Sequence, residues 1–343
     1  MRKISVIIPC YNVERWIDRC MMSIEVQTIG MEELEIICID DASTDNTWNH
    51  LKKWKQRYPE HIVLIRQEVN KRQGAARNIG LQYASAEWIA FIDADDWLES
   101  DCLEQLYTPI VQYDCDVSFC DWTADMSDLF TCFEKDDAKK AEGDFYGVAD
   151  TEEKKKKWIG RRVLGDSVCG KIIRKSIIFE NKIFFPEELA YEDMYWVPLL
   201  HVYVKSAYKV GKKMYHYFVG DNSTVRSKNS DHHIDWITIQ LMKWNDYQKR
   251  GLLEKYRTEL EQDALNDAVC FMKMLTLQYD RPPFSLFLLE RELIGQYIPK
   301  YQDNLYLANC TEIFSVLLEA LYCPLNKSEF QMFVTEAKKY WGE

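Results

Sequence analysis

The chain has 343 residues, 47% of them hydrophobic, so it can bury a sizeable core and has room for one large domain and a smaller one. Its formal net charge of -12 argues against a nucleic-acid partner, whose phosphates would need a basic surface. The eleven cysteines contain no CxxC pair, and no signal-peptide pattern or apolar run of about 20 residues is present. We therefore expect a cytoplasmic protein without a disulfide framework, zinc site or membrane span.

The first hundred residues alternate β-branched or aromatic runs with segments of helical periodicity. Strands are predicted at residues 3–8, 34–39, 62–66 and 88–92, and helices at residues 13–24, 47–54 and 74–84. Such alternation with short connections predicts a mostly parallel sheet with helices on both faces. Ligands of open parallel sheets bind outside the carboxyl ends of the strands, so the residues that follow each strand are the candidates for a site.

Three carboxylates, Asp93, Asp95 and Asp96, follow the fourth predicted strand directly. Like charges so close together raise one another's pKa, and a cation would relieve this. Carboxylate oxygens with open coordination positions suit Mg²⁺ or Mn²⁺, with phosphate oxygens completing the shell. Taken alone, the cluster is equally typical of a turn or a helix cap.

Four motifs in register decide between these readings. They are PCYN at residues 9–12, IDDASTDNT at 39–47, NKRQGAARNIG at 70–80 and FIDADD at 91–96. In this order and spacing they resemble the family 2 glycosyltransferases of the GT-A fold, and the resemblance extends from the first residue to about residue 225. It implies a GT-A (Rossmann-like) α/β domain, a nucleotide-sugar donor, a divalent metal (Mn²⁺ or Mg²⁺) and inversion at the anomeric carbon.

The resemblance assigns the ends of the first two strands to donor binding. Tyr11 would stack on the nucleobase, which is worth about 1–3 kcal/mol for an aromatic ring, or it only packs. Asp41 would accept a hydrogen bond from the base, with Asp40 as the alternative for this contact. Pro9 and Asn12 belong to the same donor-binding loop.

On the phosphate side, the resemblance makes Asp93 the residue that faces the ribose and Asp95 the metal ligand. Asp96 is expected to support them or to cap a helix. Arg77 would be drawn to the diphosphate or to the acid cluster, because it supplies a fixed positive charge in an acidic protein; an ordinary salt bridge is the alternative.

The stretch from Val168 to Leu200 resembles the acceptor-side half of the family, with Lys171 and the pair Glu192–Asp193 at motif positions. The resemblance makes Asp193 the general base, because an inverting transfer needs a carboxylate behind the anomeric carbon to take the proton of the acceptor hydroxyl. Glu192 is the alternative base. Asp193 would otherwise be a helix cap.

Between and after these motifs the sequence is less informative. Residues 114–120 suit a further strand, and the polar stretch 123–157, which ends in EEKKKK, is expected to be an insertion near the acceptor or a surface loop. Residues 205–218 indicate a hairpin. His216 in this hairpin is a candidate metal ligand, or an ordinary strand histidine.

Helical periodicity takes over at about residue 229, with one apolar stripe formed by Ile234, Ile237, Leu241 and Trp244. We expect this helical region to pack and to support a homo-oligomer, with contact to a membrane or a lipid-linked acceptor as the alternative. The expected domains are a GT-A domain at 1–228, divided into a nucleotide-sugar-binding half at 1–122 and an acceptor-side half at 123–228, and a helical domain at 229–343.

The sequence as a whole predicts a metal-dependent inverting glycosyltransferase of polysaccharide biosynthesis. It would move a sugar from a nucleotide-diphosphate sugar, expected to be a UDP-sugar, to a hydroxyl of a glycan or of a lipid-linked acceptor at the inner face of the membrane. One alternative is a sugar nucleotidyltransferase, but PCYNVERW lacks the glycines of a triphosphate-binding loop. The other is a non-catalytic sugar-binding scaffold.

Overall fold

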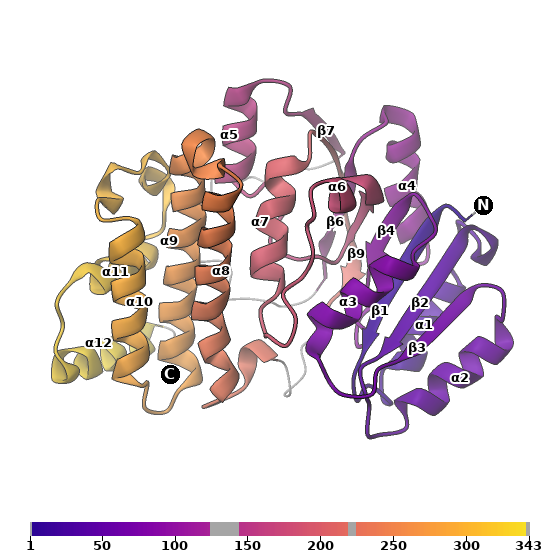
Figure 1. Cartoon of the computed structure of the whole chain (residues 1–343), viewed down its shortest axis with the longest axis horizontal. Helices are drawn as coiled ribbons and strands as arrows, with labels where there is room; N and C mark the ends of the chain where they lie inside the picture. Colours follow the sequence, from indigo (N-terminus) through magenta and orange to yellow (C-terminus); the bar gives the residue numbers. More distant parts are fainter. Residues whose placement is uncertain (1, 124–143, 219–223, 341–343) are drawn as a thin grey trace. The chain divides into compact units, whose positions relative to one another are not determined.

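The computed structural model describes residues 2–123, 144–218 and 224–340 of the chain (Figure 1). They divide into two compact units. The first unit holds the described residues up to 218 except 159–161, and the second holds residues 159–161 and those from 224 onward. The finer domain boundaries expected from the sequence stay predictions.

The first four strands of the first unit form a parallel block in the order β3-β2-β1-β4. Their bounds are β1 (Ile4–Cys10), β2 (Leu34–Asp40), β3 (Ile62–Arg66) and β4 (Trp88–Phe91). Every residue of β1 and β4 is buried, as the β-branched and aromatic runs of the sequence predict. The predicted alternation of strands and helices is confirmed in this block.

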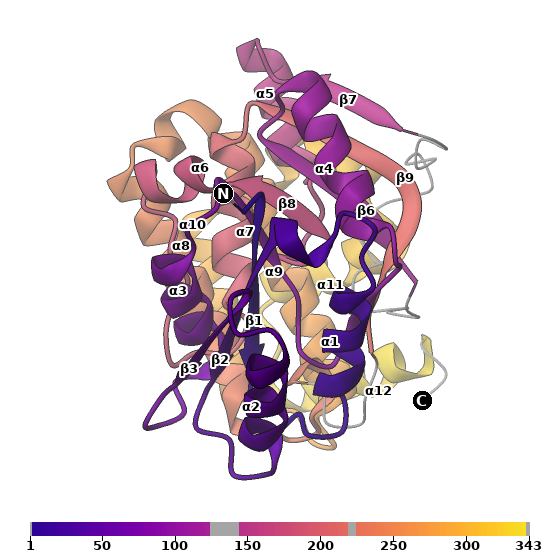
Figure 2. The same cartoon turned by 90° about the vertical axis from the view of Figure 1, so that its right-hand side faces the viewer.

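Three helices connect these strands: α1 (Ile17–Glu25), α2 (Thr47–Arg57) and α3 (Arg72–Tyr83). Figure 2 shows α3 on one side of the strands and α1 on the other. The close fit of α3 on the sheet depends on Gly80, because a Cβ atom there would lie 2.4 Å from Cγ2 of Ile7. A short 3-10 helix, η1 (Met31–Glu33), precedes β2.

The remaining strands extend the sheet beyond β4 with mixed directions. They are β5 (Trp97–Leu98), β6 (Val117–Trp122), β7 (Phe145–Val148), β8 (Lys171–Arg174) and β9 (Ser206–His216). β8 runs antiparallel between β4 and β6, β9 is parallel to β6, and β5 and β7 are antiparallel to β9. Within the described residues, all nine strands belong to one sheet.

The helices of this half are α4 (Cys102–Tyr113), α5 (Glu152–Gly160), α6 (Lys175–Glu180) and α7 (Asp193–Tyr203). The expected surface loop at residues 123–157 is wrong at its C-terminal end, where β7 and α5 form; residues 124–143 of it lie outside the described part of the chain. The EEKKKK run is helical because its charges pair one turn apart, with Lys156 3.2 Å from Glu152 and Lys157 2.9 Å from Glu153.

Two strand predictions need correction. Pro9 does not end the first strand: it pairs with Ile39, because β4 stops at the level of Ile7 and no neighbour needs the N–H that proline lacks. The hairpin expected at residues 205–218 is also wrong. This segment is one continuous strand whose partners β6, β7 and β5 come from elsewhere in the chain, so it needs no internal turn.

The second unit is helical, as predicted. Its helices are α8 (Asp235–Lys249), α9 (Leu252–Gln278), α10 (Phe284–Tyr297), α11 (Glu312–Tyr322) and α12 (Lys327–Tyr340), with 3-10 helices η2 (Thr224–Arg226), η3 (Asp231–Ile234), η4 (Tyr301–Asp303) and η5 (Leu305–Asn309). None of the helices in the described part of the chain combines the length and the apolar character needed to cross a bilayer.

Polar side chains are buried where α8 packs against α9 and α10. The ammonium group of Lys243 on α8 lies 2.5 Å from Oδ2 of Asp263 and also contacts Asp267, both on α9. Gln240 donates to both carboxylate oxygens of Glu290 on α10, at 3.0 and 2.9 Å. Burial raises the pKa of Glu290 to about 8, so this carboxyl group is largely protonated at neutral pH.

Candidate active site

The residues that follow β1, β2 and β4 lie on one edge of the sheet. Because β2, β1 and β4 are parallel neighbours, Tyr11, Asp41 and Asp93 follow the carboxyl ends of three adjacent strands. The Asp41 N–H donates to the Cys10 carbonyl at 2.8 Å, which ties the first two of these strand ends together. The Tyr11 side chain is 46% exposed, so one of its faces can receive a flat ligand.

Two neighbouring carboxylates end β2, and the protein engages them differently. Asp40 is fully buried and pairs with Arg66, whose Nε lies 3.0 Å from Asp40 Oδ2. Asp41 accepts hydrogen bonds through Oδ1 from the Gln67 side chain at 2.6 Å and from the Lys71 N–H at 2.8 Å. Burial is the main cause that raises the pKa of Asp41. The Asp40 carboxylate is thus occupied by its ion pair with Arg66, which favours Asp41 as the residue that contacts the base.

Asn12 shapes the loop that follows β2. Its backbone has a φ of 52°, a left-handed conformation that asparagine tolerates. Its side-chain oxygen accepts from the N–H groups of Thr44 at 2.8 Å and Asp45 at 3.3 Å, while its own N–H donates to Ser43 Oγ. The structure therefore places the Asn12 side chain among the residues of this loop.

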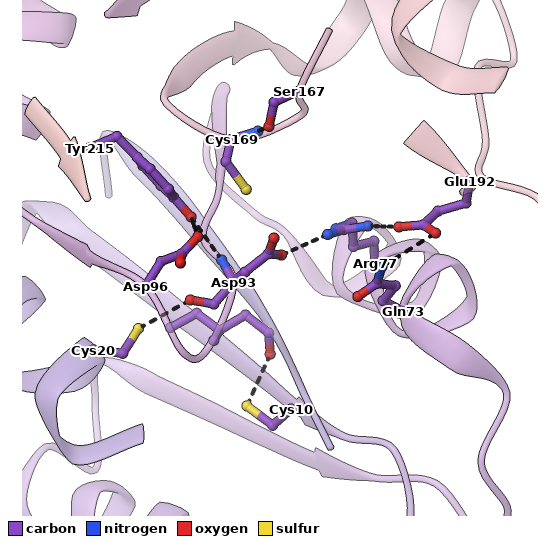
Figure 3. A network of polar contacts seen from close by, with 11 residues as sticks. Cys10, Cys20, Gln73, Arg77, Asp93, Asp96, Ser167, Cys169, Glu192 and Tyr215 are labelled. Atoms are coloured by element: carbon purple, nitrogen blue, oxygen red, sulfur yellow. Dashed lines mark hydrogen bonds and ion pairs between the residues drawn. The ribbon is translucent and has the colours of Figure 1, made fainter. Parts of the chain in front are cut away.

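The acid loop, residues 93–96, is anchored by a tyrosine of β9 (Figure 3). The hydroxyl of Tyr215 donates to Asp96 Oδ2 at 2.5 Å and accepts from the Asp93 N–H at 3.2 Å. The Phe218 N–H donates to the other oxygen of Asp96 at 2.7 Å. Burial, reinforced by Asp93 and Asp95, raises the pKa of Asp96 to about 9. Asp96 therefore anchors the loop, and no pattern in the sequence indicates that Tyr215 takes part.

Arg77 joins the acid loop to the segment that precedes α7. Its Nη2 lies 2.6 Å from Asp93 Oδ1, its Nη1 pairs with Glu192, and its side chain is only 2% exposed (Figure 3). Burial alone would lower the pKa of Arg77, but Asp93 and Glu192 together raise it above its ordinary value. Of the alternatives left open for Arg77, the contact with the acid cluster is present, and Glu192 adds a second partner.

A glycine lets α3 come this close to the Glu192 segment. A Cβ atom on Gly74 would lie 2.1 Å from the Pro186 carbonyl oxygen, which is far inside contact distance. On the other side, Tyr191 has a φ of 64°, a left-handed conformation that is uncommon for a bulky residue. The backbone on both sides of the Arg77–Glu192 pair is therefore constrained to bring these two side chains together.

Asp193 is the first residue of α7 and is partly exposed. Its Oδ1 accepts from the Met194 N–H at 3.0 Å. Burial and then the neighbouring Glu192 raise the pKa of Asp193 to about 7, against the opposing effect of Arg77. A carboxylate with this pKa can take up a proton near neutral pH, which is what a general base requires.

The donor set around Asp95 fits a cation that takes most of its ligands from elsewhere. No group of three or more His, Cys, Asp or Glu side chains in the described residues is arranged to hold a metal. The partly exposed Asp95 carboxylate and the second oxygen of Asp93 remain as hard donors at this edge. Mg²⁺ and Mn²⁺ use one or two carboxylates in this way when water and phosphate oxygens complete the shell.

His216 makes contacts that compete with metal binding. Its Nε2 lies 2.7 Å from Glu99 Oε1 and its Nδ1 lies 2.6 Å from Thr123 Oγ1, so both ring nitrogens have protein partners. The ring also stacks on Trp97 with the centroids 4.8 Å apart. The structure therefore favours the reading of His216 as an ordinary strand histidine.

Comparison with known proteins gives the fold and the family of the chain. Its fold is similar to that of residues 1–349 of TarS from S. aureus, crystallised in complex with UDP-GlcNAc, with a TM-score of 0.58 over 93% of this chain and 91% of that chain at 20% identity. This is the GT-A fold of glycosyltransferases, as the sequence predicted. The sequence model described as glycosyl transferase family 2 matches residues 5–180, and the chain belongs to this family.

Two bacterial glycosyltransferases are similar to this chain in sequence. The chain is 32% identical over 179 residues to glycosyltransferase GlyA of Streptococcus pneumoniae, a match that covers 52% of this chain and 21% of that protein. It is 29% identical over 273 residues to the putative glycosyltransferase EpsH of Bacillus subtilis, covering 78% and 76% of the two chains. The chain thus spans about a fifth of the length of the pneumococcal relative and about three quarters of the Bacillus one.

Proposed function

We propose that the chain transfers a sugar from a nucleotide-diphosphate sugar to a hydroxyl group of an acceptor, with inversion at the anomeric carbon. The observation that carries this proposal is the Arg77 bridge. Arg77 pairs with Asp93 at the donor end of β4 and with Glu192, the residue before Asp193. The bridge thereby links Asp93, proposed to face the donor, to the segment that carries Asp193. The pKa of Asp193, about 7, suits a general base.

The donor would lie along the edge formed by β2, β1 and β4. The exposed face of Tyr11 offers a stacking surface for the base, and Asp41 offers a carboxylate to a base N–H. Asp93 would face the ribose, while Pro9 and Asn12 shape the loop beside it. A UDP-sugar is the first donor to test, because the TarS crystals whose fold is similar contained UDP-GlcNAc.

Asp95 would hold Mn²⁺ or Mg²⁺ together with the diphosphate oxygens. The ion would supply the positive charge that offsets the negative charge of the departing nucleotide. The other two carboxylates of the acid loop are both held in place: Arg77 pairs with the Asp93 carboxylate, and the Tyr215 hydroxyl donates to Asp96.

Asp193 would act as the general base. The acceptor oxygen forms a bond to the anomeric carbon, the bond from that carbon to the diphosphate oxygen breaks, and the hydroxyl proton passes to the Asp193 carboxylate. Inversion follows because base and leaving group lie on opposite faces of the sugar ring. Glu192 is a poor alternative, since it is 1% exposed and pairs with Arg77.

The acceptor is proposed to be a glycan or a lipid-linked sugar on the cytoplasmic side of a membrane. The chain is similar to a poly(ribitol-phosphate) beta-glucosyltransferase of Bacillus spizizenii, 42% identical over 106 residues that cover 31% of this chain and 17% of that protein, and this supports a polymeric surface glycan as the acceptor class. Peripheral membrane contact and homo-oligomerisation through residues 229–343 stay predictions.

The test is a panel of nucleotide sugars measured with and without Mn²⁺, by thermal shift and by release of the nucleotide. A UDP-sugar should stabilise the wild-type chain only with the metal, and Asp95→Ala should remove the shift. Asp193→Asn should lower turnover by about 10²–10⁴-fold with donor binding kept. Glu188→Gln, which alters an exposed carboxylate in the same segment, is the matched control and should change neither.

Two outcomes would contradict the proposal. If no nucleotide shifts the melting temperature in the presence of metal, the result favours a non-catalytic scaffold protein instead. If Asp193→Asn keeps full turnover, another group is the base.

A further inference from the structure

A second arginine, Arg19 of α1, also contacts the acid loop. The Nη2 of Arg19 donates to the main-chain carbonyl of Asp95 at 2.5 Å. Its guanidinium carbon lies 4.0 Å from the ring centroid of Trp97 and 5.1 Å from that of Phe218. The cation therefore contacts two aromatic rings while it donates to the backbone of the proposed metal ligand.

The rings that hold this guanidinium are themselves held by other elements. Trp97 on β5 stacks on His216 of β9 at an interplanar angle of 10°, and the two residues are paired across the strands. Phe218 packs against Trp16, with centroids 5.3 Å apart. Stacking on fixed rings orients a planar guanidinium far better than solvent would, so the direction of the Arg19 hydrogen bond is fixed as well.

The contacts of Arg19 are not those of an ordinary surface ion pair. Its side chain is partly buried, and its Nε is buried without a hydrogen-bond partner among the described residues. A buried donor left unpaired costs free energy, so other contacts of the Arg19 side chain must offset this cost. The guanidinium contacts two aromatic rings and the Asp95 carbonyl.

We infer that Arg19 is a positioning residue for Asp95: anchored on Trp97 and Phe218, its guanidinium fixes the Asp95 carbonyl and thereby the direction in which the acid loop presents the Asp95 carboxylate. The inference rests on the proposed function, in which Asp95 holds the cation and the diphosphate. Arg19 acts through Asp95 and takes no part in the proton transfer.

The chemistry of the side chain distinguishes this role from simple packing. Lysine at position 19 keeps the positive charge but lacks the flat group that can stack on Trp97 and donate sideways at once. Methionine keeps an apolar stem of similar length and loses both the charge and the donor. Arg19→Lys should therefore restore part of what Arg19→Met removes.

The experiment uses the full chain and two measurements. The first is the affinity for Mn²⁺ in the presence of UDP, by calorimetry. The second is amide hydrogen exchange of residues 93–98 without ligand. Arg19→Met should weaken Mn²⁺ binding about tenfold and speed exchange of this segment about tenfold, and Arg19→Lys should lie between it and wild type. Arg15→Met is the matched control, since Arg15 is exposed just before the same helix, and should match wild type.

The outcomes separate this inference from the proposed function. If wild type binds Mn²⁺ with UDP and Arg19→Met binds equally well with unchanged exchange, the inference is overturned and the proposed function stands. If Arg19→Met only lowers the melting temperature, with Mn²⁺ affinity unchanged at a temperature where it is folded, Arg19 is merely structural and the inference is again overturned. If wild type binds neither Mn²⁺ nor UDP, the proposed function falls and the inference falls with it.

Discussion

Glu192 and Asp193 are adjacent in the chain but have different partners: Glu192 pairs with Arg77, whereas Asp193 accepts a hydrogen bond from the Met194 N–H. The ion pair gives the buried Glu192 carboxylate a cationic partner. The negative charge of Glu192 helps to raise the pKa of Asp193 to about 7, after the larger effect of burial. Two neighbouring carboxylates thus take different roles, one as a structural link and one as a group that can exchange a proton.

The first prediction concerns pH. A base must be deprotonated to act, so kcat/KM of the wild-type chain should rise with pH through a midpoint near 7, the pKa of Asp193. Glu192→Gln removes the negative neighbour that raises this pKa, so the midpoint should move to lower pH. Glu188→Gln should leave it in place. A profile that is flat between about pH 5.5 and 8.5 would show that Asp193 is not the titrating group.

The second prediction concerns the Arg77 bridge. Arg77→Met leaves the buried Glu192 carboxylate and the half-buried Asp93 without their cation, so it should lower the free energy of unfolding by about 3–5 kcal/mol. Arg57→Met breaks the pair with Glu25, in which Arg57 is 60% exposed, and should cost less than about 1 kcal/mol. Urea denaturation measures both. Equal costs for the two variants would mean that the bridge does not contribute as a buried pair.

The third prediction compares two helical glycines. Gly74→Ala forces its Cβ atom against the Pro186 carbonyl oxygen and should destabilise the chain by about 1–3 kcal/mol while weakening turnover, because α3 must move away from Glu192. Gly295→Ala in α10 meets no atom within 4 Å and should instead stabilise by about 0.5–1 kcal/mol. Thermal unfolding and turnover of both variants check this. A stable and active Gly74→Ala would show that the approach of α3 to Pro186 is loose.

The fourth prediction concerns the helical unit. The folded-state pKa of Glu290, about 8, lies above the ordinary value of 4.5, so folding favours the protonated form. The contribution of Glu290 to stability is therefore fully present below about pH 4.5, falls as the pH rises from there to 8, and stays low above it. Glu290→Gln cannot ionise and should flatten the pH dependence of the unfolding free energy in this window. An identical dependence in both chains would contradict the assignment.

The sequence predicted those parts of the fold that local pattern determines. The β-branched runs identify β1 to β4, including the carboxylates that end β2 and follow β4, and the bounds of β3 are those expected. It failed where the deciding partner is distant. The segment 205–218, predicted to be a hairpin, contains the single strand β9, because the strands that pair with it, β6 and β7, lie far away in the sequence. The supporting contacts of Tyr215 to Asp96 span 119 residues and leave no local signal.

The helical unit shows the same limit for apolar stripes. Leu241, expected on the buried face of α8, is 39% exposed, whereas Lys243 is 2% exposed. A periodicity of apolar residues cannot identify Lys243 as buried, since that depends on Asp263 and Asp267 of α9. For the proposed site, sequence motifs identify the groups meant to meet the ligand, but the residues that orient them, such as Arg19, become visible only in three dimensions.

The contacts of the Tyr215 hydroxyl determine when the acid loop can form during synthesis of the chain. All four motifs have been translated once residue 96 is added, yet the phenol hydroxyl that bonds to Asp96 and to the Asp93 N–H belongs to β9, the last strand of the sheet. A nascent chain or a truncation product that stops short of β9 would carry every donor motif and still lack a formed acid loop. We therefore expect that residues 1–122, the predicted nucleotide-sugar-binding half, do not bind the donor when they are expressed alone or grafted onto another protein.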